Sequence, residues 1–268
     1  MPYELNTAAG NKKFHNDYWG KLHKFLLKNI ENRPFTNVWT SLSKFELKST
    51  SRSYGRYGEF KYESAETFFS EKEKTLYDAL NKYITSETDC IIELGSGWGR
   101  NILKLADRLH DTNIDFIAAE LSDSGRNITD LFTKNYNLNV SIAEFNWYDV
   151  DGISKIISNG NYKNVVIYSY HSIEQIHELD STIFTNILSL DIDVKCIHIE
   201  PVAFQYKNEK SPFRNKSAHY NCNLKKCLDG LSDAGLIHID NIDIGYFQSH
   251  TTYSGKNATL IQWKKKHS

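Results

Sequence analysis

A short apolar run that ends in an acid and three alternating glycines constrains this chain most. Residues 90–100 read CIIELGSGWGR, and the next ten residues have a helix-forming composition with apolar positions at Leu103, Ala106 and Leu109. The apolar run is too short for a helix, so the pattern predicts a strand, a tight turn and a helix. This unit opens a doubly wound α/β fold, which binds nucleotide-like ligands at the carboxyl ends of its strands.

The spacing of the glycines distinguishes between cofactors. A dinucleotide fingerprint, G-x-G-x-x-G, would place its third glycine at position 100, where the chain has Arg100. The chain instead has an acid, Glu93, followed by Gly95, Gly97 and Gly99. This pattern resembles motif I of the class I S-adenosylmethionine (SAM)-dependent methyltransferases. The resemblance covers residues 86–268 and implies an enzyme that uses SAM, built on a Rossmann-like seven-stranded sheet with an antiparallel last strand.

The order of elements after residue 85 agrees with this resemblance. Five short apolar runs alternate with helical or loop material, at 90–94, 116–120, 140–143, 165–168 and 196–199. Two further strands are expected at about 237–247 and 258–263. In the first of them the apolar phase slips, which predicts a β-bulge at Asp240–Asn241.

Residues 1–85 have a different character and are expected to form a helical and aromatic cap. Apolar residues recur at helical spacing over 14–30 until Pro34, and a capping box at 70–73 predicts the start of another helix. Residues 51–61 are rich in Gly, Tyr and Arg and are predicted to be an irregular loop. We expect residues 51–69 to pass over the cofactor pocket as a lid, with Tyr54 and Tyr57 contacting the substrate.

Composition narrows the range of partners. Lys and Arg number 32 and Asp and Glu 33, which gives a net charge of −1 and no basic field for a long nucleic acid. The polar N-terminus lacks the apolar region of a signal peptide, and no run approaches a membrane span. These features predict a cytoplasmic protein with a small-molecule acceptor, either a monomer or a homodimer.

Cysteine usage gives no clear metal site. Cys90 and Cys196 lie in apolar, strand-like runs, where a thiol behaves as a small hydrophobe. His219, Cys222 and Cys227 lie close together, but their spacing is irregular and a fourth ligand is missing. We therefore expect no bound metal.

Several residues are expected to bind the cofactor. Glu120 ends the second strand, 21 residues after Gly99, where doubly wound folds place an acid that accepts hydrogen bonds from ribose hydroxyls. After the third strand, the resemblance implies that Asn146 reads the adenine and Trp147 stacks on it, although Asp149 is an alternative reader and Trp147 an alternative core residue. Arg100 either pairs with the methionine carboxylate of SAM or is exposed. Tyr170, Glu93 and the three glycines complete the predicted cofactor site.

The catalytic candidates follow the fourth and fifth strands. His171 lies at a strand-to-helix turn, next to a second capping box at Ser172–Gln175, and histidine titrates near neutral pH. Glu200 ends the fifth strand before Pro201 and is the second candidate base. His219 and Tyr220 are expected to line the substrate pocket.

The motifs of other methyltransferase classes are missing. The chain has no Asn/Asp-Pro-Pro-Tyr after the fourth strand, no Pro-Cys nucleophile, no paired-glutamate hairpin and no acidic set for a catalytic metal. What remains is metal-independent transfer to a small molecule such as a sugar or secondary metabolite, with oxygen as the leading acceptor. Transfer to nitrogen and a non-catalytic SAM-binding scaffold are the alternatives.

Overall fold

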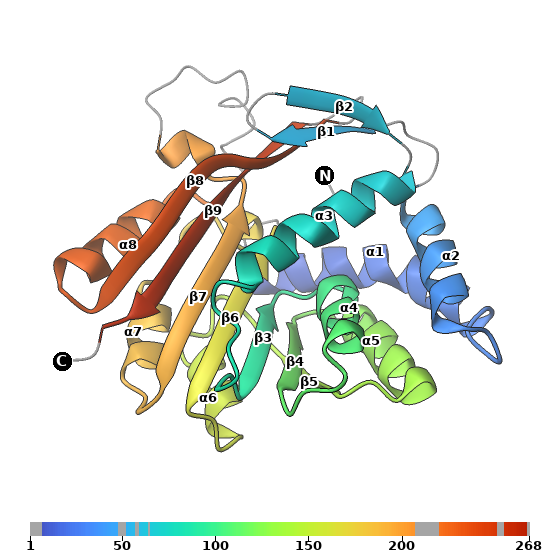
Figure 1. Ribbon diagram of the computed structural model, residues 1–268, viewed down its shortest axis with the longest axis horizontal. Helices are drawn as coiled ribbons and strands as arrows, with labels where there is room; N and C mark the ends of the chain where they lie inside the picture. Colours follow the sequence, from blue (N-terminus) through green and yellow to red (C-terminus); the bar gives the residue numbers. More distant parts are fainter. Residues whose placement is uncertain are drawn as a thin grey trace.

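A computed structural model describes residues 7–47, 52–56, 59–63, 65–206, 220–250 and 255–266. Its central feature is a nine-stranded sheet with the order β2-β1-β8-β9-β7-β6-β3-β4-β5 (Figure 1). The five parallel strands are β3 (Cys90–Leu94), β4 (Asp115–Glu120), β5 (Val140–Glu144), β6 (Asn164–Tyr170) and β7 (Asp193–Glu200). All five occur where the apolar runs predicted them, with bounds that differ by no more than a few residues.

The sheet ends in the predicted antiparallel hairpin. Strand β8 (Ile237–His250) pairs with β9 (Gly255–Lys265), and β9 lies between β8 and β7, antiparallel to both. The register shifts between Ile239 and Asn241, which confirms the predicted bulge, and shifts again between Ile244 and Phe247. Strands β3 to β9 therefore form the predicted seven-stranded sheet.

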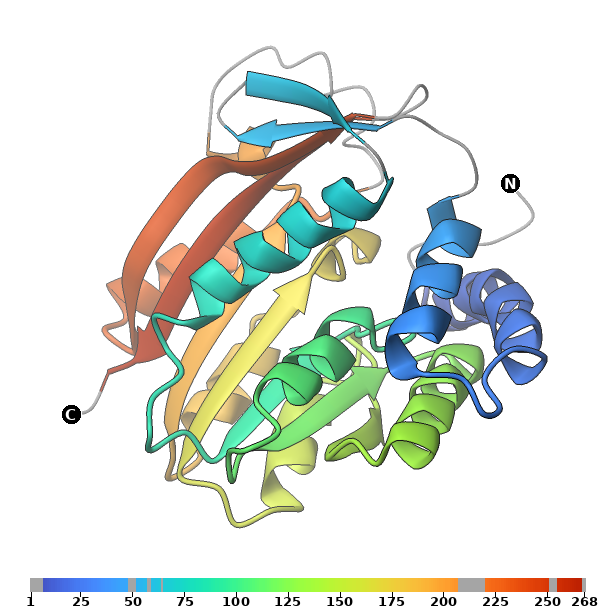
Figure 2. The same cartoon turned by 45° about the vertical axis from the view of Figure 1, so that its right-hand side comes forward.

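Helices cover both faces of this sheet because side chains of successive strand residues point to opposite faces. On one face, Ile91 packs with α1 (Ala8–Leu27), α2 (Phe35–Leu47), α3 (Ala65–Leu80), α4 (Arg100–Arg108) and α5 (Asp123–Tyr136). On the other face, the next residue, Ile92, packs with α6 (Gly152–Ser158), α7 (Thr182–Leu188) and α8 (Leu224–Asp233). Figure 2 shows α1 and α2 beside α5, at the carboxyl ends of the parallel strands.

The N-terminal region differs from the sequence prediction in two places. Residues predicted as an irregular loop form β1 (Arg52–Arg56) and β2 (Glu59–Glu63), an antiparallel hairpin that pairs with the far end of β8 and widens the sheet. The prediction failed because the pairing with β8 is non-local and the segment lacks regular alternation. Ser70 is not an N-cap either, since α3 already begins at Ala65.

No described helix combines the length and apolar character that crossing a membrane requires.

Candidate active site

A cavity of about 210 Å³ opens at the carboxyl ends of β3, β4 and β6. The glycine turn after β3 forms its floor, and residues after β4, β5 and β6 form its walls. The sequence-predicted residues that line it are Glu93, Gly95, Gly97, Arg100, Glu120, Asn146, Trp147, Tyr170 and His171. The fold thus brings together nine of the predicted site residues from four segments of the chain.

The three motif glycines are required by backbone conformation and by close packing. Their φ angles are +70° at Gly95, +59° at Gly97 and +83° at Gly99, a region that L-residues with side chains rarely adopt. A Cβ on Gly95 would stand 1.8 Å from Ser172 Oγ, and one on Gly99 would stand 2.7 Å from Thr129 Oγ1. Any side chain at either position would therefore displace the neighbouring turn or helix.

Glu93 anchors the start of α4 from beneath the glycine turn. Its carboxylate accepts hydrogen bonds from Asn101 Nδ2 at 2.6 Å and from the backbone N–H of Ile102 at 3.1 Å. Burial raises the pKa of Glu93 to about 7, although these donors and the charge of Lys72 oppose the shift. The acid of the motif thus holds the turn in shape and presents a group that titrates near neutral pH.

Glu120 binds the same turn from the end of β4. Its Oε2 accepts a hydrogen bond from the Gly97 N–H at 2.9 Å, and its Oε1 accepts from the backbone N–H and the hydroxyl of Ser122 at 2.8 and 2.6 Å. The carboxylate is 5 % exposed and lines the cavity. It is therefore held in a fixed orientation at the position that the sequence predicts for a ribose partner.

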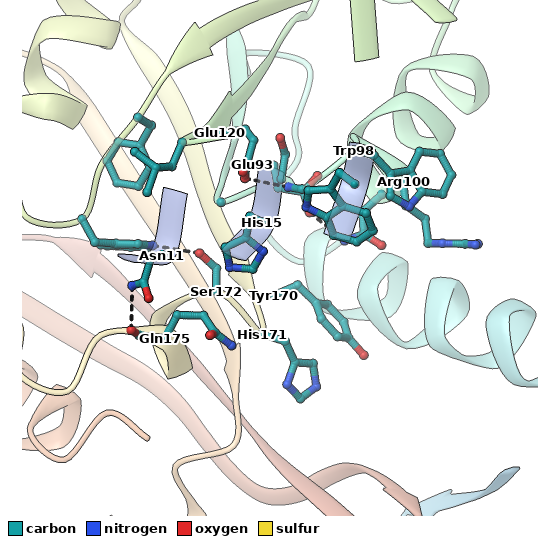
Figure 3. Close-up of a pocket in the computed structure, with 18 of the residues that line it drawn as sticks. Asn11, His15, Glu93, Trp98, Arg100, Glu120, Tyr170, His171, Ser172 and Gln175 are labelled. Atoms are coloured by element: carbon teal, nitrogen blue, oxygen red, sulfur yellow. Dashed lines mark hydrogen bonds between the residues drawn. The ribbon is translucent and has the colours of Figure 1, made fainter. Parts of the chain in front are cut away.

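Arg100 belongs to the cavity lining and is not exposed, which was one of the two alternatives for this residue. It is buried, and its guanidinium carbon lies 3.5 Å from the ring centroid of Phe69 and 4.9 Å from that of Trp98. Its Nη2 donates a hydrogen bond to Ser43 Oγ at 3.1 Å. Figure 3 shows its side chain directed away from the centre of the pocket. Arg100 joins α2 and α3 to the start of α4 through cation–π contacts.

Asn146 and Trp147 lie where the adenine end of a cofactor is expected. Asn146 is half-buried, and its Oδ1 accepts a hydrogen bond from the Tyr148 N–H at 3.1 Å, which leaves its amide NH₂ as a donor. Trp147 is buried against Phe145, and its Nε1 donates to Ser172 Oγ at 2.8 Å. That bond shows why the predicted capping box is wrong: the Ser172 hydroxyl makes no bond to the following 3₁₀ turn, η1 (Ile173–Gln175).

Lys72, which sequence reasoning missed, brings a cation into the cavity from α3. Its Nζ lies 4.3 Å from the centroid of the Tyr170 ring, and its charge acts on Glu93. No local pattern marks Lys72 as a site residue, because only the docking of α3 across the sheet brings it there. Lys72 is therefore a cation of the cavity lining that the sequence did not predict.

His171 and Glu174 form a pair at the end of β6. His171 Nδ1 lies 3.2 Å from Glu174 Oε2, and Glu174 is 3 % exposed. His171 lines the cavity and has a left-handed backbone with φ of +55°. A buried carboxylate therefore fixes the imidazole of a residue that lines the cavity.

Glu200, the other predicted base, lies outside the cavity lining and is fully buried. Its Oε1 accepts hydrogen bonds from Ser169 Oγ at 2.7 Å and from the N–H groups of Ser172 and Ile173, and its Oε2 accepts from the Glu174 N–H. Burial, with the charge of Glu174, raises its pKa to about 7. The strand-end position predicted a side chain in the cleft, but the carboxylate turns to the N–H groups of the turn after β6.

A buried chain of polar groups continues from Glu200 to the last strand. Trp263 Nε1 donates to His198 Nε2 at 3.0 Å, so the proton of this imidazole is on Nδ1, 3.0 Å from Ser169 Oγ. Burial lowers the pKa of His198 to about 3, which keeps the ring neutral. The network fixes the turn that carries His171 against β7 and β9.

Helix α1 contributes Asn11, His15 and Trp19 to the lining of the cavity. Figure 3 shows Asn11 and His15 among the other lining residues. The three residues of α1 recur every four positions, so they lie on one face of the helix. The stripe could not be predicted from the sequence, because the apolar residues of the same helix dominate its pattern. Residues 51–69 were expected to pass over the pocket as a lid, but the described hairpin β1–β2 lies at the edge of the sheet beside β8.

Two polar atoms at the cavity are buried and have no hydrogen-bond partner within the described part of the chain. They are the Trp19 Nε1 and the Ser96 Oγ. Buried polar groups are nearly always hydrogen-bonded in folded proteins. These two atoms therefore fit a ligand with polar groups near the glycine turn.

The remaining predicted substrate residues do not line this cavity as far as the structure describes them. Tyr57 and His219 lie outside the described residues, and only the backbone of Tyr54 is described, within β1. Tyr220 is half-buried and lies outside the cavity lining. Cys222 is exposed and Cys227 buried, and the described residues contain no group of three His, Cys, Asp or Glu side chains that could hold a metal.

The chain was compared with known proteins by sequence and by structure. No protein-family model matches it, and no curated protein matches its sequence. Its structure is similar to that of the [4+2]-cyclase SpnF, with a TM-score of 0.57 and 11 % identity over 98 % of this chain and 97 % of the other.

Two methyltransferases give comparable matches. An O-methyltransferase from Bacillus cereus in complex with SAH (S-adenosylhomocysteine) has a TM-score of 0.52 and 13 % identity, over 93 % of this chain and 99 % of the other. A geranyl diphosphate C-methyltransferase from Streptomyces coelicolor A3(2) has a TM-score of 0.50 and 12 % identity, over 76 % and 81 %. The chain therefore has the fold of the class I SAM-dependent methyltransferases, as its glycine motif predicted.

Proposed function

We propose that this protein is a SAM-dependent methyltransferase that acts on a hydroxyl group of a small molecule, with His171 as the general base. The observation that carries the proposal is the His171–Glu174 pair at the end of β6, where an imidazole held by a buried carboxylate lines the cavity. The similarity to an O-methyltransferase over nearly the whole chain supports the reaction type.

The residues of the cavity fit SAM. Glu120 has the position for a ribose hydroxyl, the Asn146 amide offers a donor to adenine, and Lys72 offers a cation to a carboxylate. The unpartnered Ser96 Oγ and Trp19 Nε1 face the same space. When bound, SAM supplies a methyl group that its sulfonium charge activates for in-line displacement.

The chain's own contribution is to position the acceptor and to remove its proton. With its proton on Nδ1 donated to Glu174, His171 carries a lone pair on Nε2. The acceptor hydroxyl gives its proton to this nitrogen as the methyl group is transferred. Glu174 holds the ring in this tautomer and stabilises the imidazolium that forms.

Glu200 supports this arrangement from below and is not proposed as the base. Three of the four hydrogen bonds to its carboxylate come from the turn that carries His171, the fourth comes from Ser169 Oγ in β6, and the side chain is fully buried. A proton from an acceptor in the cavity has no direct path to it. Its proposed role is to hold Ser172, Ile173 and Glu174 in place.

The proposal is tested by incubating the purified protein with isotope-labelled SAM and hydroxyl acceptors such as sugars, phenols and polyketide alcohols. Formation of SAH together with a labelled ether would support it, whereas a labelled amine as the only product would favour the N-methyltransferase alternative. Absence of SAH binding would overturn the assignment of the cofactor.

A second candidate is a reaction without methyl transfer. The similarity to a [4+2]-cyclase covers 98 % of this chain, so the fold also carries chemistry in which no methyl group moves. SAH binding without methyl transfer to any acceptor, together with cyclisation of a polyene substrate, would favour this candidate. SAH binding without any turnover would favour a SAM-binding scaffold.

A further inference from the structure

Helix α1 spans the cavity from one wall to the other. At one end Asn11 Nδ2 donates to the carbonyl oxygen of Gln175, in the turn after β6, at 3.1 Å. At the other end Trp19 covers the glycine turn, where a Cβ on Gly97 would stand 3.1 Å from its Cζ2. His15 lies between these two contacts and points into the cavity (Figure 3).

The N-terminal half of α1 is held in this place by polar contacts. Lys12 Nζ lies 3.1 Å from Glu144 and 3.4 Å from Asp123, and Asn16 Oδ1 accepts a hydrogen bond from the Ser124 N–H at 3.0 Å. The helix is thus docked on the ends of β5 and α5, next to Glu120. These contacts hold His15 in the lining of the cavity.

The hydrogen bonds of Glu120 limit what this carboxylate can bind. A carboxylate offers about four acceptor positions. Within the part of the chain that the structure describes, three are used, by the N–H and hydroxyl of Ser122 on Oε1 and by the Gly97 N–H on Oε2. One position on Oε2 remains, so Glu120 can accept one hydroxyl proton without giving up a bond. A vicinal diol has two hydroxyls, and the second requires another partner.

His15 has the chemistry and the position for that second hydroxyl. It lines the same cavity, and the charges of Glu120 and Glu174 both act on it. Burial nevertheless lowers its pKa below the ordinary value, which favours the neutral ring. A neutral imidazole has one donor and one acceptor nitrogen, so it can bind a hydroxyl in either direction.

We propose that His15 and Glu120 together recognise the two hydroxyls of a ribose-type diol, each taking one. The inference rests on the proposed function, because the diol is that of the SAM nucleoside. It makes the N-terminal helix part of the cofactor site, and it assigns a ligand-binding role to a residue far outside the glycine motif.

The test uses SAH and its 2′-deoxy and 3′-deoxy analogues with the wild-type protein, His15→Ala and His15→Gln. His23→Ala is the matched control, because it removes the same side chain from the same helix and His23 is not in the cavity lining. Dissociation constants come from isothermal titration calorimetry, and thermal melting checks that each variant is folded. If His15→Ala does not fold, His15→Gln is used instead, because glutamine keeps a hydrogen-bond donor and has a similar size.

Wild type and His23→Ala should bind SAH about fivefold or more tightly than each deoxy analogue, the effect of one lost hydrogen bond. Two ratios are compared, the dissociation constant of each deoxy analogue divided by that of SAH. In His15→Ala, one of these ratios should fall below about twofold, while the other should stay as in wild type. If both ratios are unchanged in His15→Ala and His15→Gln, the inference is overturned, even when SAH itself binds more weakly. If wild type does not bind SAH at all, the proposed function fails first, so the two failures are distinguishable.

Discussion

The carboxylate of Glu120 and the backbone N–H of Gly97 are joined by a hydrogen bond of 2.9 Å. The two residues lie 23 positions apart in the chain, Gly97 in the turn after β3 and Glu120 at the end of the neighbouring strand β4. The bond fixes the glycine turn and the strand-end acid relative to each other before any ligand arrives. Such preorganisation lowers the entropic cost of binding.

Replacing Glu120 by alanine should weaken SAH binding by about 1.5–3 kcal/mol, the value of a hydrogen bond to a charged group. Glu87→Ala is the control, because Glu87 is exposed and outside the cavity lining. Calorimetric titration of both folded variants measures the effect. If Glu120→Ala binds SAH as tightly as wild type does, Glu120 does not bind the ribose.

Replacing His171 by alanine should lower turnover by about 10²–10⁴, the contribution of a general base. Cofactor affinity should change by less than about threefold, because the imidazole acts on the acceptor. His177→Ala, which removes an exposed histidine a few residues further along the chain, is the control. Turnover close to that of wild type, together with an inactive Glu200→Gln, would show that the base is Glu200.

Replacing Glu200 by glutamine should lower the free energy of unfolding by about 1–3 kcal/mol, because the amide NH₂ faces N–H donors that the carboxylate now satisfies. Turnover should fall less than in His171→Ala. Urea denaturation measures the stability, with the exposed Glu178→Gln as the control. A variant as stable as wild type would contradict the structural role.

The stability of the protein should depend on pH through Glu93. Its pKa is raised from 4.5 to about 7 in the folded state, so between these values the folded protein holds a proton that the unfolded chain has lost. The free energy of unfolding should therefore fall as pH rises through this range, by at most about 3 kcal/mol. The stabilising contribution of Glu93 is complete below a pH of about 4.5, its unfolded pKa, and is lost above a pH of about 7, its folded pKa.

Glu93→Gln isolates this effect, because the amide does not titrate, while Glu200 and His198 titrate alike in both proteins. Urea unfolding at about pH 5 and about pH 7.5 should show a smaller difference in the variant than in wild type. Equal differences in the two proteins would mean that Glu93 does not titrate in this range.

Replacing Arg100 by lysine should reduce the free energy of unfolding by about 1–2 kcal/mol, because an ammonium group makes weaker contacts with Phe69 and Trp98 than a guanidinium does. Affinity for SAH should stay within about threefold of wild type. Arg33→Lys, at an exposed arginine outside the cavity lining, is the control. A tenfold loss of affinity would restore the carboxylate role that the sequence suggested.

The parts of the fold that the sequence predicted are those that local patterns determine. The apolar runs of β3 to β7, the glycine turn and the bulge at Asp240–Asn241 each follow from residues near in the chain. The hairpin β1–β2 was missed because its pairing with β8 joins segments nearly 200 residues apart, and no local alternation marks it.

The site divides in the same way. Glu120 and His171 follow strand ends, so their positions at the cavity could be predicted from the order of elements. His15 and Lys72 belong to helices whose docking depends on tertiary packing, and nothing in their own neighbourhood indicates it. The position of Glu200 was predicted correctly, but its direction was not, because three N–H groups of a neighbouring turn attract the carboxylate.

The left-handed backbone of His171 has a consequence for how the protein can be improved. At a φ of +55° most side chains are strained, and glycine is not. Histidine at this position therefore lowers the stability of the fold somewhat, while it places an imidazole in the lining of the cavity. His171→Gly should melt at a higher temperature than His171→Ala while being equally inactive, so a search for thermostable variants would select against turnover at this position.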